Sequence, residues 1–383
     1  MKATILAMFL LVSFVYFCNG QEKIALESEI QDIMTQYQAV GISAVVVKDN
    51  KICYNQSFGY NPDYDDVALR TPISEDGVYW LASVSKTFVS TAIMQLVEKR
   101  RVKLDGDINK YLKYYVRNPK YPNIPITVRM LLCHRSSLND SQYGWTMDML
   151  NVENEEYAAN FNDYKPGSQY DYCNLGYSLL AAIIEGVTGM RFDEYIDKNI
   201  CEPLGLNASF NLTKMDDSKL VHALLYNQEK KEFYADKSIY NYRYIQNKLN
   251  NYELGKSTAY LSPAGGMRMN ATDLAKWMMA HMNYGKYDGT RIIRKRTEKA
   301  MWKPQASDRN YAFAFSQYDN VVEGENFYGM TGGSHGIHSL FFFNPKEKYG
   351  FVVICNGCNS KWGNGGDMNY KIVETLYKHF IKK

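Results

Sequence analysis

The sequence predicts an α+β fold, in which N- and C-terminal segments form one antiparallel sheet flanked by helices, with a mainly helical region inserted. Two hairpin patterns carry this prediction. Near the start, the apolar runs 42–47 and 52–58 are joined by a short polar turn. Near the end, the runs 339–343 and 349–354 flank a polar turn that contains proline. Strands at both ends with helix patterns between them favour a sheet that both termini complete.

Helical spacing of apolar residues accounts for much of the remaining chain. It predicts a helix around Ile30 to Tyr37, others within 84–97, 127–132 and 179–187, and a last one near the C-terminus. Gly189 is expected to end the third of these inner helices. We therefore expect one domain over 21–383, with its α/β part at about 21–95 and 255–383 and a helical insertion at about 96–254.

The composition is that of an ordinary globular protein. The 383 residues are 46% hydrophobic and 22% charged, which excludes a collagen-like, low-complexity or disordered chain. The net charge is +3. This near-neutrality gives no electrostatic reason to expect a nucleic acid or an anionic membrane as partner.

The first twenty residues have the pattern of a secretory signal peptide. Lys2 precedes an apolar run from 5 to 12, and small residues come before Gln21, so we expect cleavage near Gly20. Anchoring as a lipoprotein through Cys18 is the alternative, but the bulky Phe17 argues against it. We expect a periplasmic or secreted protein without stable membrane insertion, because no later stretch is as long and apolar as a transmembrane helix.

Six cysteines follow the predicted signal peptide, and two of them form a lone C-x-x-C at 355–358. Zinc is not expected here, because the motif has no second pair and no nearby histidine cluster. We interpret Cys355 and Cys358 as small buried side chains near a turn. Their number permits disulfides in an exported chain, but the spacing alone assigns no pairing.

The first candidate catalytic motif is S-x-x-K at Ser83 and Lys86, at the start of an apolar helix pattern. This spacing puts the hydroxyl and the amine on one face, one turn apart. A helix N-terminus favours developing negative charge. A lysine on a partly buried face loses hydration, so its pKa falls and it can accept a proton. An N-cap serine with a surface lysine is the structural alternative.

Two further motifs contain groups that could act with this serine. In an extended segment, the side chains of Tyr172 and Asn174 point the same way. A nearby lysine ammonium could depress the pKa of the Tyr172 phenol, which could then act as a base. The Asn174 amide could orient that lysine. Glycines after Met330 and Thr331 allow close approach to the backbone, so the N–H of Gly333 can serve as an oxyanion donor. The structural alternative for 172–174 is a polar loop, and the alternative for the glycines at 332 and 333 is a turn that requires positive φ.

Together these motifs resemble the serine β-lactamase and penicillin-binding protein superfamily, in its class C β-lactamase-like branch of β-lactamases, peptidases and esterases. The segment 101–106 is similar to that family's "KLxLDD" stretch, and 126–138 is similar to its "ITVRHLLTHTSGL". Tyr172-Cys-Asn174 matches its Y-x-N, and 340–345 its closing strand. Ser137 stands where the family usually has glycine, and no function is attached to that difference.

The resemblance implies a β-lactamase/transpeptidase-like fold and assigns roles residue by residue. Ser83 would be the nucleophile, Lys86 and Tyr172 the coupled general base, and Asn174 the residue that positions them. The N–H groups of Ser83 and Gly333 would form the oxyanion hole. Neither a metal nor an organic cofactor is implied. The substrate-binding residues would be Met330, Thr331, Gly332 and His335.

One departure from the family pattern concerns the substrate. The family has Lys or His before T-G, where it supplies positive charge near a substrate carboxylate, and this chain has Met330. A thioether cannot supply that charge. His335 and His338 are the candidates to supply that charge instead. The difference weakens the β-lactam and D-Ala-D-Ala interpretations and favours a less anionic ester or amide.

The predicted function is that of a secreted serine hydrolase acting through an acyl-enzyme on an ester, amide or β-lactam carbonyl. Its partner would be a small-molecule acyl donor. The alternatives are an acyltransferase that passes the acyl group from Ser83 to an alcohol acceptor, a DD-peptidase or penicillin-binding protein, and a non-catalytic binding protein on the same fold.

A rival motif is the G-x-S-x-G at 332–336, which has the form of an α/β-hydrolase nucleophile elbow, with Asp367 and His379 following in the right order. An elbow must lie between a strand and a helix, whereas this one leads into a predicted hairpin strand. The remaining histidines, His134, His222 and His281, are expected to be structural.

Overall fold

The computed structural model describes residues 22–63, 66–142, 144, 146–235, 242–359 and 365–382. The predicted signal peptide and its cleavage site lie outside these residues. Within them, no helix has the length and apolar character that crossing a membrane requires.

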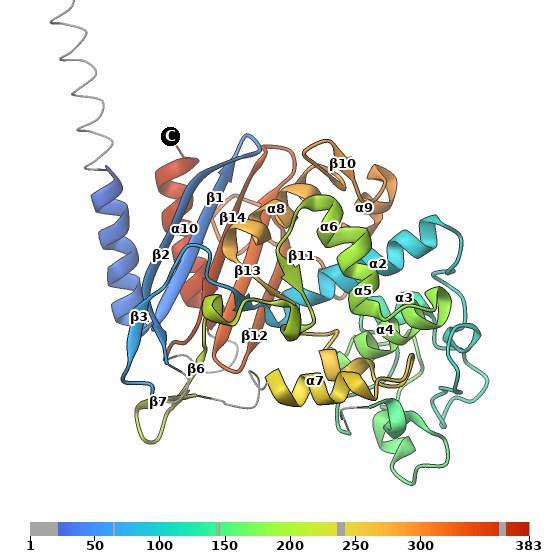
Figure 1. Ribbon diagram of the computed structural model, residues 1–383. Coiled ribbons are helices and arrows are strands. Elements are labelled where there is room, and N and C mark those ends of the chain that lie inside the picture. Colours follow the sequence, from blue (N-terminus) through green and yellow to red (C-terminus); the bar gives the residue numbers. More distant parts are fainter. Residues whose placement is uncertain are drawn as a thin grey trace, which may run out of the picture.

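A seven-stranded sheet forms the centre of the molecule (Figure 1). Its strand order is β11-β12-β13-β14-β1-β2-β3, and every neighbouring pair is antiparallel. β14 lies directly beside β1, where Ile42 pairs with Cys355. The two termini therefore complete one sheet, as the hairpin patterns predict. The strands are β1 (Gly41–Lys48), β2 (Lys51–Pro62), β3 (Arg70–Pro72), β11 (Ser316–Tyr318), β12 (Phe327–Ser334), β13 (Ile337–Asn344) and β14 (Tyr349–Cys355).

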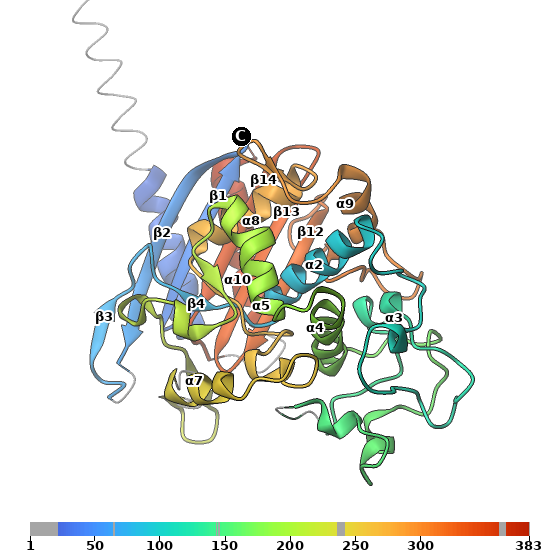
Figure 2. The same cartoon turned by 45° about the vertical axis from the view of Figure 1, so that its right-hand side comes forward.

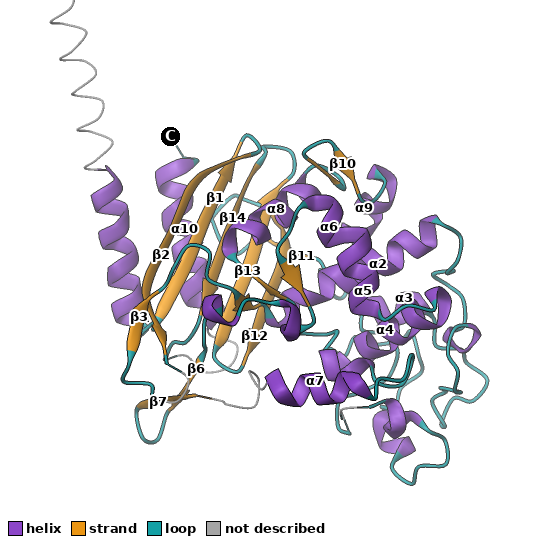
Figure 3. Cartoon of the chain, viewed as in Figure 1, coloured by secondary structure: helices purple, strands orange, loops and turns teal. Residues whose placement is uncertain are grey.

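Helices cover both faces of this sheet (Figures 1 and 3). The helix over 22–36 and the C-terminal α10 (Gly365–Phe380) pack on one face, where Ile30 and Leu376 are fully buried in one apolar cluster. On the other face, α2 (Lys86–Glu98) and α8 (Ala271–Met282) belong to a second, larger cluster. β1 and β14 are buried along almost their whole length because apolar layers cover both of their faces.

The inserted region lies beside the sheet and is mainly helical (Figure 2). The predicted boundary between 95 and 96 falls within α2. Gly189, with φ 72°, ends α4 in the left-handed conformation that favours glycine. The helices of this region are α3 (Val128–Leu132), α4 (Asn174–Thr188), α5 (Phe192–Ile196), α6 (Glu202–Leu204) and α7 (Tyr242–Asn250), and its strands are β5 (Ala208–Ser209), β6 (Leu224–Asn227) and β7 (Glu232–Ala235).

Three short elements join the insertion to the sheet domain. β8 (Arg268–Met269) lies between β4 (Tyr79–Trp80) and β5 in a three-stranded sheet. This sheet holds the segment just before Ser83 against the insertion. The chain therefore reaches the predicted nucleophile at the junction of the two parts.

The cysteines agree with the structural interpretation of the C-x-x-C motif. The six described cysteines form no disulfide with one another, and both Cys355 and Cys358 are buried. Cys355 ends β14, and its thiol donates to the carbonyl of Gly357 at 3.2 Å. The pair is therefore part of the packed end of the sheet.

Candidate active site

Ser83 lies in a 3₁₀ turn (Ala82–Ser85) that leads directly into α2. The preceding Ala82 has φ 47°, a left-handed conformation that costs energy for a residue with a Cβ. The carbonyl of Leu81 accepts a hydrogen bond from Ser339 Oγ at 2.7 Å, which ties this turn to β13. The surrounding structure thus holds a strained turn immediately before the predicted nucleophile.

Lys86 is fully buried and its amine faces Ser83. Its Nζ lies 3.2 Å from Ser83 Oγ, and it donates to Asn174 Oδ1 and to the carbonyl of Ala264, each at 2.8 Å. Burial lowers the pKa of Lys86 from 10.5 to about 7, although the negative charge of Asp140 acts in the opposite direction. The amine can therefore lose its proton near neutral pH, as the sequence analysis expects of a base.

Tyr172 donates a hydrogen bond from its hydroxyl to Ser83 Oγ at 2.7 Å. The expectation that Lys86 would depress the phenol pKa is wrong in direction, because burial raises the pKa of Tyr172 above its ordinary value. The ammonium lies 4.7 Å from the centre of the ring, a position that is over its face. Tyr172 consequently keeps its proton and can pass one on, whereas Lys86 is the group that can accept a proton.

Asp140 is a residue that the sequence analysis missed. Its carboxylate accepts the side-chain N–H of Asn174 at 2.8 Å and the backbone N–H groups of Asn174 and Leu175, each at 2.9 Å. It therefore caps the start of α4 and fixes the amide that contacts Lys86. The sequence does place an aspartate two residues after the 126–138 motif. The distance along the chain from 140 to 174 does not show that the two residues are in contact.

His134 lies behind Tyr172 and supports it. The backbone N–H of Cys173 donates to His134 Nδ1 at 3.1 Å, so the ring proton is on Nε2, which lies 3.0 Å from the hydroxyl of Tyr311. Burial lowers the pKa of His134 well below its ordinary value. Its ring centre is 4.3 Å from that of Tyr172. The ring is neutral and packed, which agrees with the predicted structural role.

The glycines of β12 approach the nucleophile closely. A Cβ added to Gly332 would lie 2.5 Å from the carbonyl oxygen of Leu81 and 2.9 Å from the backbone nitrogen of Ser83. At Gly333 the nearest atom would be 3.9 Å away. Only glycine fits at 332, and this contact brings the next residue, with its N–H, to the cavity that Ser83 lines.

These residues line a cavity of about 630 Å³. The four residues predicted to bind substrate all lie in its wall, and so do Ser83, Tyr172, Asn174 and Gly333. None of the described lining residues is Lys, Arg, Asp or Glu. Besides Tyr172, five described Trp and Tyr side chains contribute to the wall, of which Trp80 comes from β4 and Tyr370 from α10; the others are Tyr170, Tyr311 and Tyr318.

The α/β-hydrolase alternative is wrong because the G-x-S-x-G segment forms a β-hairpin. Ser334 ends β12, and Ile337 begins the antiparallel β13 without an intervening helix. Asp367 and His379 lie on α10, and His379 Nε2 lies 3.2 Å from Glu29 Oε1. Neither is among the residues that line the cavity with Ser334.

The other histidines also belong to the packing of the fold. His281 Nδ1 lies 2.6 Å from Glu298 Oε1, with both side chains fully buried. His222 Nδ1 lies 3.0 Å from the carbonyl of Pro62. The described part of the chain contains no group of three or more His, Cys, Asp or Glu that could hold a metal ion.

Comparison with known proteins identifies the family. The β-lactamase family model matches residues 26–370, which include the whole site and all seven strands of the central sheet. The chain belongs to the β-lactamase family. This is a family of serine hydrolases, and the resemblance seen in the sequence motifs is confirmed.

Individual relatives of this β-lactamase-family protein are distant. Protein flp of Staphylococcus aureus (strain MRSA252) is 26% identical over 333 residues, a match that covers 82% of this chain and 59% of that protein. The octameric penicillin-binding protein homologue from Pyrococcus abyssi has a TM-score of 0.71 at 25% identity, covering 92% of this chain and 77% of that one. EstCE1, described as a hydrolase with promiscuous acyltransferase activity, has a TM-score of 0.70 at 19% identity, covering 92% and 98%.

Proposed function

We propose that this protein hydrolyses an uncharged ester or amide through an acyl-enzyme on Ser83. The observation that carries the proposal is the hydrogen-bonded set of Lys86 Nζ, Ser83 Oγ and Tyr172 hydroxyl, at 3.2 and 2.7 Å, beside a cavity with no Lys, Arg, Asp or Glu among its described lining residues. Such a set matches what an activated serine requires: a nucleophile within reach of a base, and a base held by a further group, which here is Asn174.

In the first half of the proposed reaction, Ser83 Oγ attacks the carbonyl carbon of the acyl donor and loses its proton to neutral Lys86. The N–H groups of Ser83 and Gly333 would stabilise the oxyanion. Tyr172 then gives its proton to the leaving oxygen or nitrogen as the bond from the carbonyl carbon breaks, and Lys86 restores the proton to Tyr172. The products of this half are the Ser83 ester and a free alcohol or amine.

In the second half, water occupies the position of the leaving group. Lys86 takes a proton from the water as the water oxygen attacks the ester carbonyl. The bond from the carbonyl carbon to Ser83 Oγ then breaks, and Lys86 returns the proton to Ser83 Oγ. The free acid departs and the site returns to its starting state. No step of this cycle needs a redox change, and the residues present can carry each proton.

The charge of the cavity wall decides which substrates we favour. Met330 is 4% exposed and stands where the family usually has a cation. His335 and His338, which the sequence analysis offered as substitutes, both line the cavity, and the ring centre of His335 lies 5.1 Å from that of Trp80. An apolar or aromatic acyl or leaving group would bury its surface against the tyrosines, whereas a carboxylate would lose hydration without a strong cation to replace it.

Trapping of the acyl-enzyme tests the proposal. The wild-type protein and Ser83→Ala are incubated with a panel of neutral activated esters, amides and β-lactams, and intact masses are measured. We expect an adduct of the acyl group on the wild type, mapped by peptide mass to Ser83, together with steady-state hydrolysis. Ser83→Ala should show neither. Undiminished hydrolysis by the variant, or an adduct elsewhere, would contradict the nucleophile assignment.

Acyl transfer is the second candidate. The aromatic cavity wall could hold an organic alcohol as well as water, and EstCE1, which shares the fold, is described as having acyltransferase activity. Product analysis with a neutral ester and competing alcohols separates the two activities. A new ester that outweighs free acid would favour transfer, whereas free acid alone would favour hydrolysis. Absence of any Ser83 adduct with an intact fold would favour a non-catalytic binding protein.

Export of the chain also remains a proposal, which rests on residues 1–20.

A further inference from the structure

The described surface carries a concentration of positive charge away from the cavity. Residues 98–103 and 286–303 contain eleven lysines and arginines against three acids, although the whole chain has a net charge of only +3. These segments form the end of α2, the hairpin of β9 (Lys286–Tyr287) and β10 (Thr290–Arg291), and α9 (Lys295–Trp302). The near-neutral total therefore averages over a basic region and an acidic remainder.

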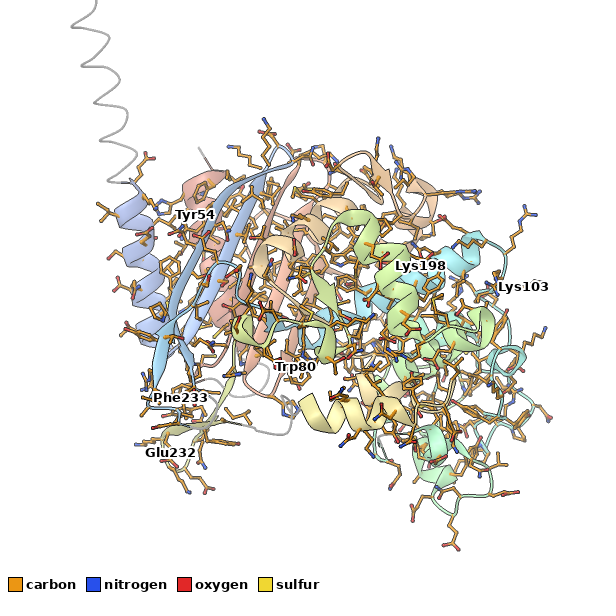
Figure 4. All side chains as sticks on the ribbon, in the orientation of Figure 1. Tyr54, Trp80, Lys103, Lys198, Glu232 and Phe233 are labelled. Atoms are coloured by element: carbon orange, nitrogen blue, oxygen red, sulfur yellow. The ribbon has the colours of Figure 1, made fainter. Side chains whose placement is uncertain are left out.

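Hydrogen bonds join the two segments. The backbone N–H of Arg294 donates to Glu98 Oε1 at 2.8 Å, and Gln95 Nε2 donates to the carbonyl of Ile292 at 3.0 Å. Figures 1 and 2 both show α9 at the same end of the molecule as the C-terminal end of α2, Figure 1 shows β10 beside α9, and Figure 4 places Lys103 just beyond that end of α2. We call nine of the exposed cations here, together with the half-buried Lys348, the basic face: Lys99, Arg100, Arg101, Lys286, Arg291, Arg294, Lys295, Arg296, Lys299 and Lys348.

Three lysines of the basic face converge on one tyrosine. The ammonium nitrogens of Lys295, Lys299 and Lys348 lie 4.8, 5.5 and 5.2 Å from the ring centre of Tyr284. No ion pair with a described Asp or Glu is present at any of the three. The pKa of Lys348 is lowered by burial and, secondly, by the positive charge of Lys295. Lys348 Nζ donates to the carbonyl of Met282 and to Asn283 Oδ1, at 3.0 and 3.1 Å, but no described carboxylate neutralises the three charges.

The fold gives partners to some of these cations: Arg294 Nε lies 4.0 Å from Glu98 Oε2, and Arg291 donates to the carbonyls of Tyr284 and Ile293. It does not explain Lys295, Arg296 and Lys299, which form no ion pair with a described Asp or Glu. Arg294, Lys295 and Arg296 stand at the N-terminal end of α9, where the helix dipole disfavours cations. The acid of this helix, Glu298, is fully buried and faces His281, so it does not offset them at the surface. Positive charges that weaken the isolated protein in this way are compensated when an anionic partner binds.

We infer that the basic face binds a linear anionic glycan, with a sulfate or phosphate group seated among Lys295, Lys299 and Lys348. A bilayer is less suited, because none of the exposed large hydrophobic side chains of the described residues lies on this face. Single-stranded nucleic acid is also less suited, because its binding uses exposed aromatic rings on which bases stack, whereas the Tyr284 ring is occupied by lysines. A linear polymer that is recognised only through its negative charges needs neither apolar nor stacking side chains, and the basic face supplies the cations that bind such a polymer.

The position of the basic face is compatible with catalysis. The 13 residues of α2 separate it from Ser83, a distance of roughly 20 Å along the helix axis. A glycan bound there would hold the protein on a polymer and leave the cavity open. This inference does not rest on the proposed hydrolysis, since binding and turnover are measured separately.

The probe for the test is a fluorescently labelled heparin dodecasaccharide, titrated with the full chain at several NaCl concentrations around 0.1 M. The test variant is Lys295→Glu/Lys299→Glu. Its matched control is Lys230→Glu/Lys231→Glu, in the β6–β7 hairpin at the opposite end of the molecule, beside the labelled Glu232 and Phe233 (Figure 4). Both variants change the net charge equally, and Lys230 and Lys231 are exposed. Unfolding midpoints and ester hydrolysis report that each variant folds.

We expect the wild type to bind heparin, with an affinity that falls as salt rises. The test variant should bind at least about tenfold more weakly, with a log–log salt slope smaller by about 2, because two cations no longer displace counterions. The control should remain within about threefold of the wild type. Equal weakening of both variants, or no wild-type binding, would overturn the site. Tighter binding to phosphatidylglycerol vesicles or to single-stranded DNA at equal salt would overturn the choice of a glycan.

Discussion

At the scale of single residues, the site separates two roles that the sequence assigned jointly. Lys86 and Tyr172 both contact Ser83, but burial moves their pKa values in opposite directions, down for the amine and up for the phenol. Burial disfavours the charged form in each case, which is the ammonium of one and the phenolate of the other. Near pH 7 a large share of Lys86 is therefore neutral and Tyr172 keeps its proton, so that the amine can accept a proton and the phenol can donate one.

Asp140 gives a direct test of this electrostatic arrangement. Its charge opposes the fall in the Lys86 pKa, and its carboxylate fixes Asn174. Asp140→Asn should therefore shift the acid limb of the pH profile of kcat/KM, expected near pH 7 in the wild type, to lower pH. It should also lower kcat by about 10- to 100-fold through misplacement of Asn174. The same change at the exposed Asp163 should alter neither quantity. An acid limb that stays in place would contradict the role of Asp140.

Met330 tests the charge argument for substrate choice. Met330→Lys places an ammonium at the cavity wall, where it can meet a substrate carboxylate. We expect acylation by β-lactams to become about tenfold faster, which corresponds to one charge-assisted contact. Hydrolysis of neutral esters should not gain. Met330→Leu, which keeps the position apolar, should leave β-lactam reactivity unchanged. If the two variants acylate at the same rate, charge at this position does not decide the substrate.

At the scale of secondary-structure elements, the site depends on how closely β12 approaches the turn before α2. Gly332 makes this contact possible, because any Cβ there would collide with the backbone of Leu81 and Ser83. The strand, the turn and the start of α4 each bring one reacting group to the cavity. None of these elements forms the site alone, so small displacements of one against another should be felt in turnover.

Gly332 and Gly333 provide a matched pair of sites that tests whether turnover depends on the close approach of β12 to the turn before α2. Gly332→Ala should push β12 away from Ser83, lower kcat/KM by about 100-fold and destabilise the fold by about 1–3 kcal/mol. Gly333→Ala, whose added methyl group would meet nothing closer than 3.9 Å, should retain most activity and stability. Kinetics with a neutral ester and urea unfolding measure both. Equal losses in the two variants would show that the close approach is not what matters.

At the scale of the whole molecule, the buried amine of Lys86 couples stability to pH. Its pKa is about 7 when folded, against an ordinary value of 10.5, so the unfolded chain binds more protons between these values. The free energy of unfolding should therefore rise with pH across that window, by up to about 1.4 kcal/mol per pH unit from this group. Below pH 7 its full destabilising cost is present.

Lys86→Met isolates this contribution. Urea unfolding of the wild type and the variant at pH 7, 8 and 9 should show their difference moving in favour of the wild type as pH rises. The replacement Lys113→Met, at an exposed lysine, should leave a difference that does not vary with pH. A constant difference for Lys86→Met as well would mean that the amine is not desolvated in the folded protein.

Much of the fold could be predicted because its signals are local or lie in ordered motifs. The hairpins at both ends have strand patterns and polar turns, and the motif residues keep recognisable spacing. Asp140 could not be predicted because its role depends on a chain reversal that brings it to the start of α4. The direction of the Tyr172 shift depends on burial, which a motif does not report. Ser137, with φ 62°, shows why related sequences favour glycine there.

The pairing of β1 with β14 also has a consequence for how the protein is made. During synthesis on the ribosome, β1 is made long before its partner β14. The central sheet that supports Ser83 is therefore incomplete until β14 has been made. Contacts so distant in sequence form slowly, and until they form an apolar strand edge stays open. We therefore expect this sheet to close late in synthesis, and a nascent chain stalled before β14 to aggregate more readily than the complete chain.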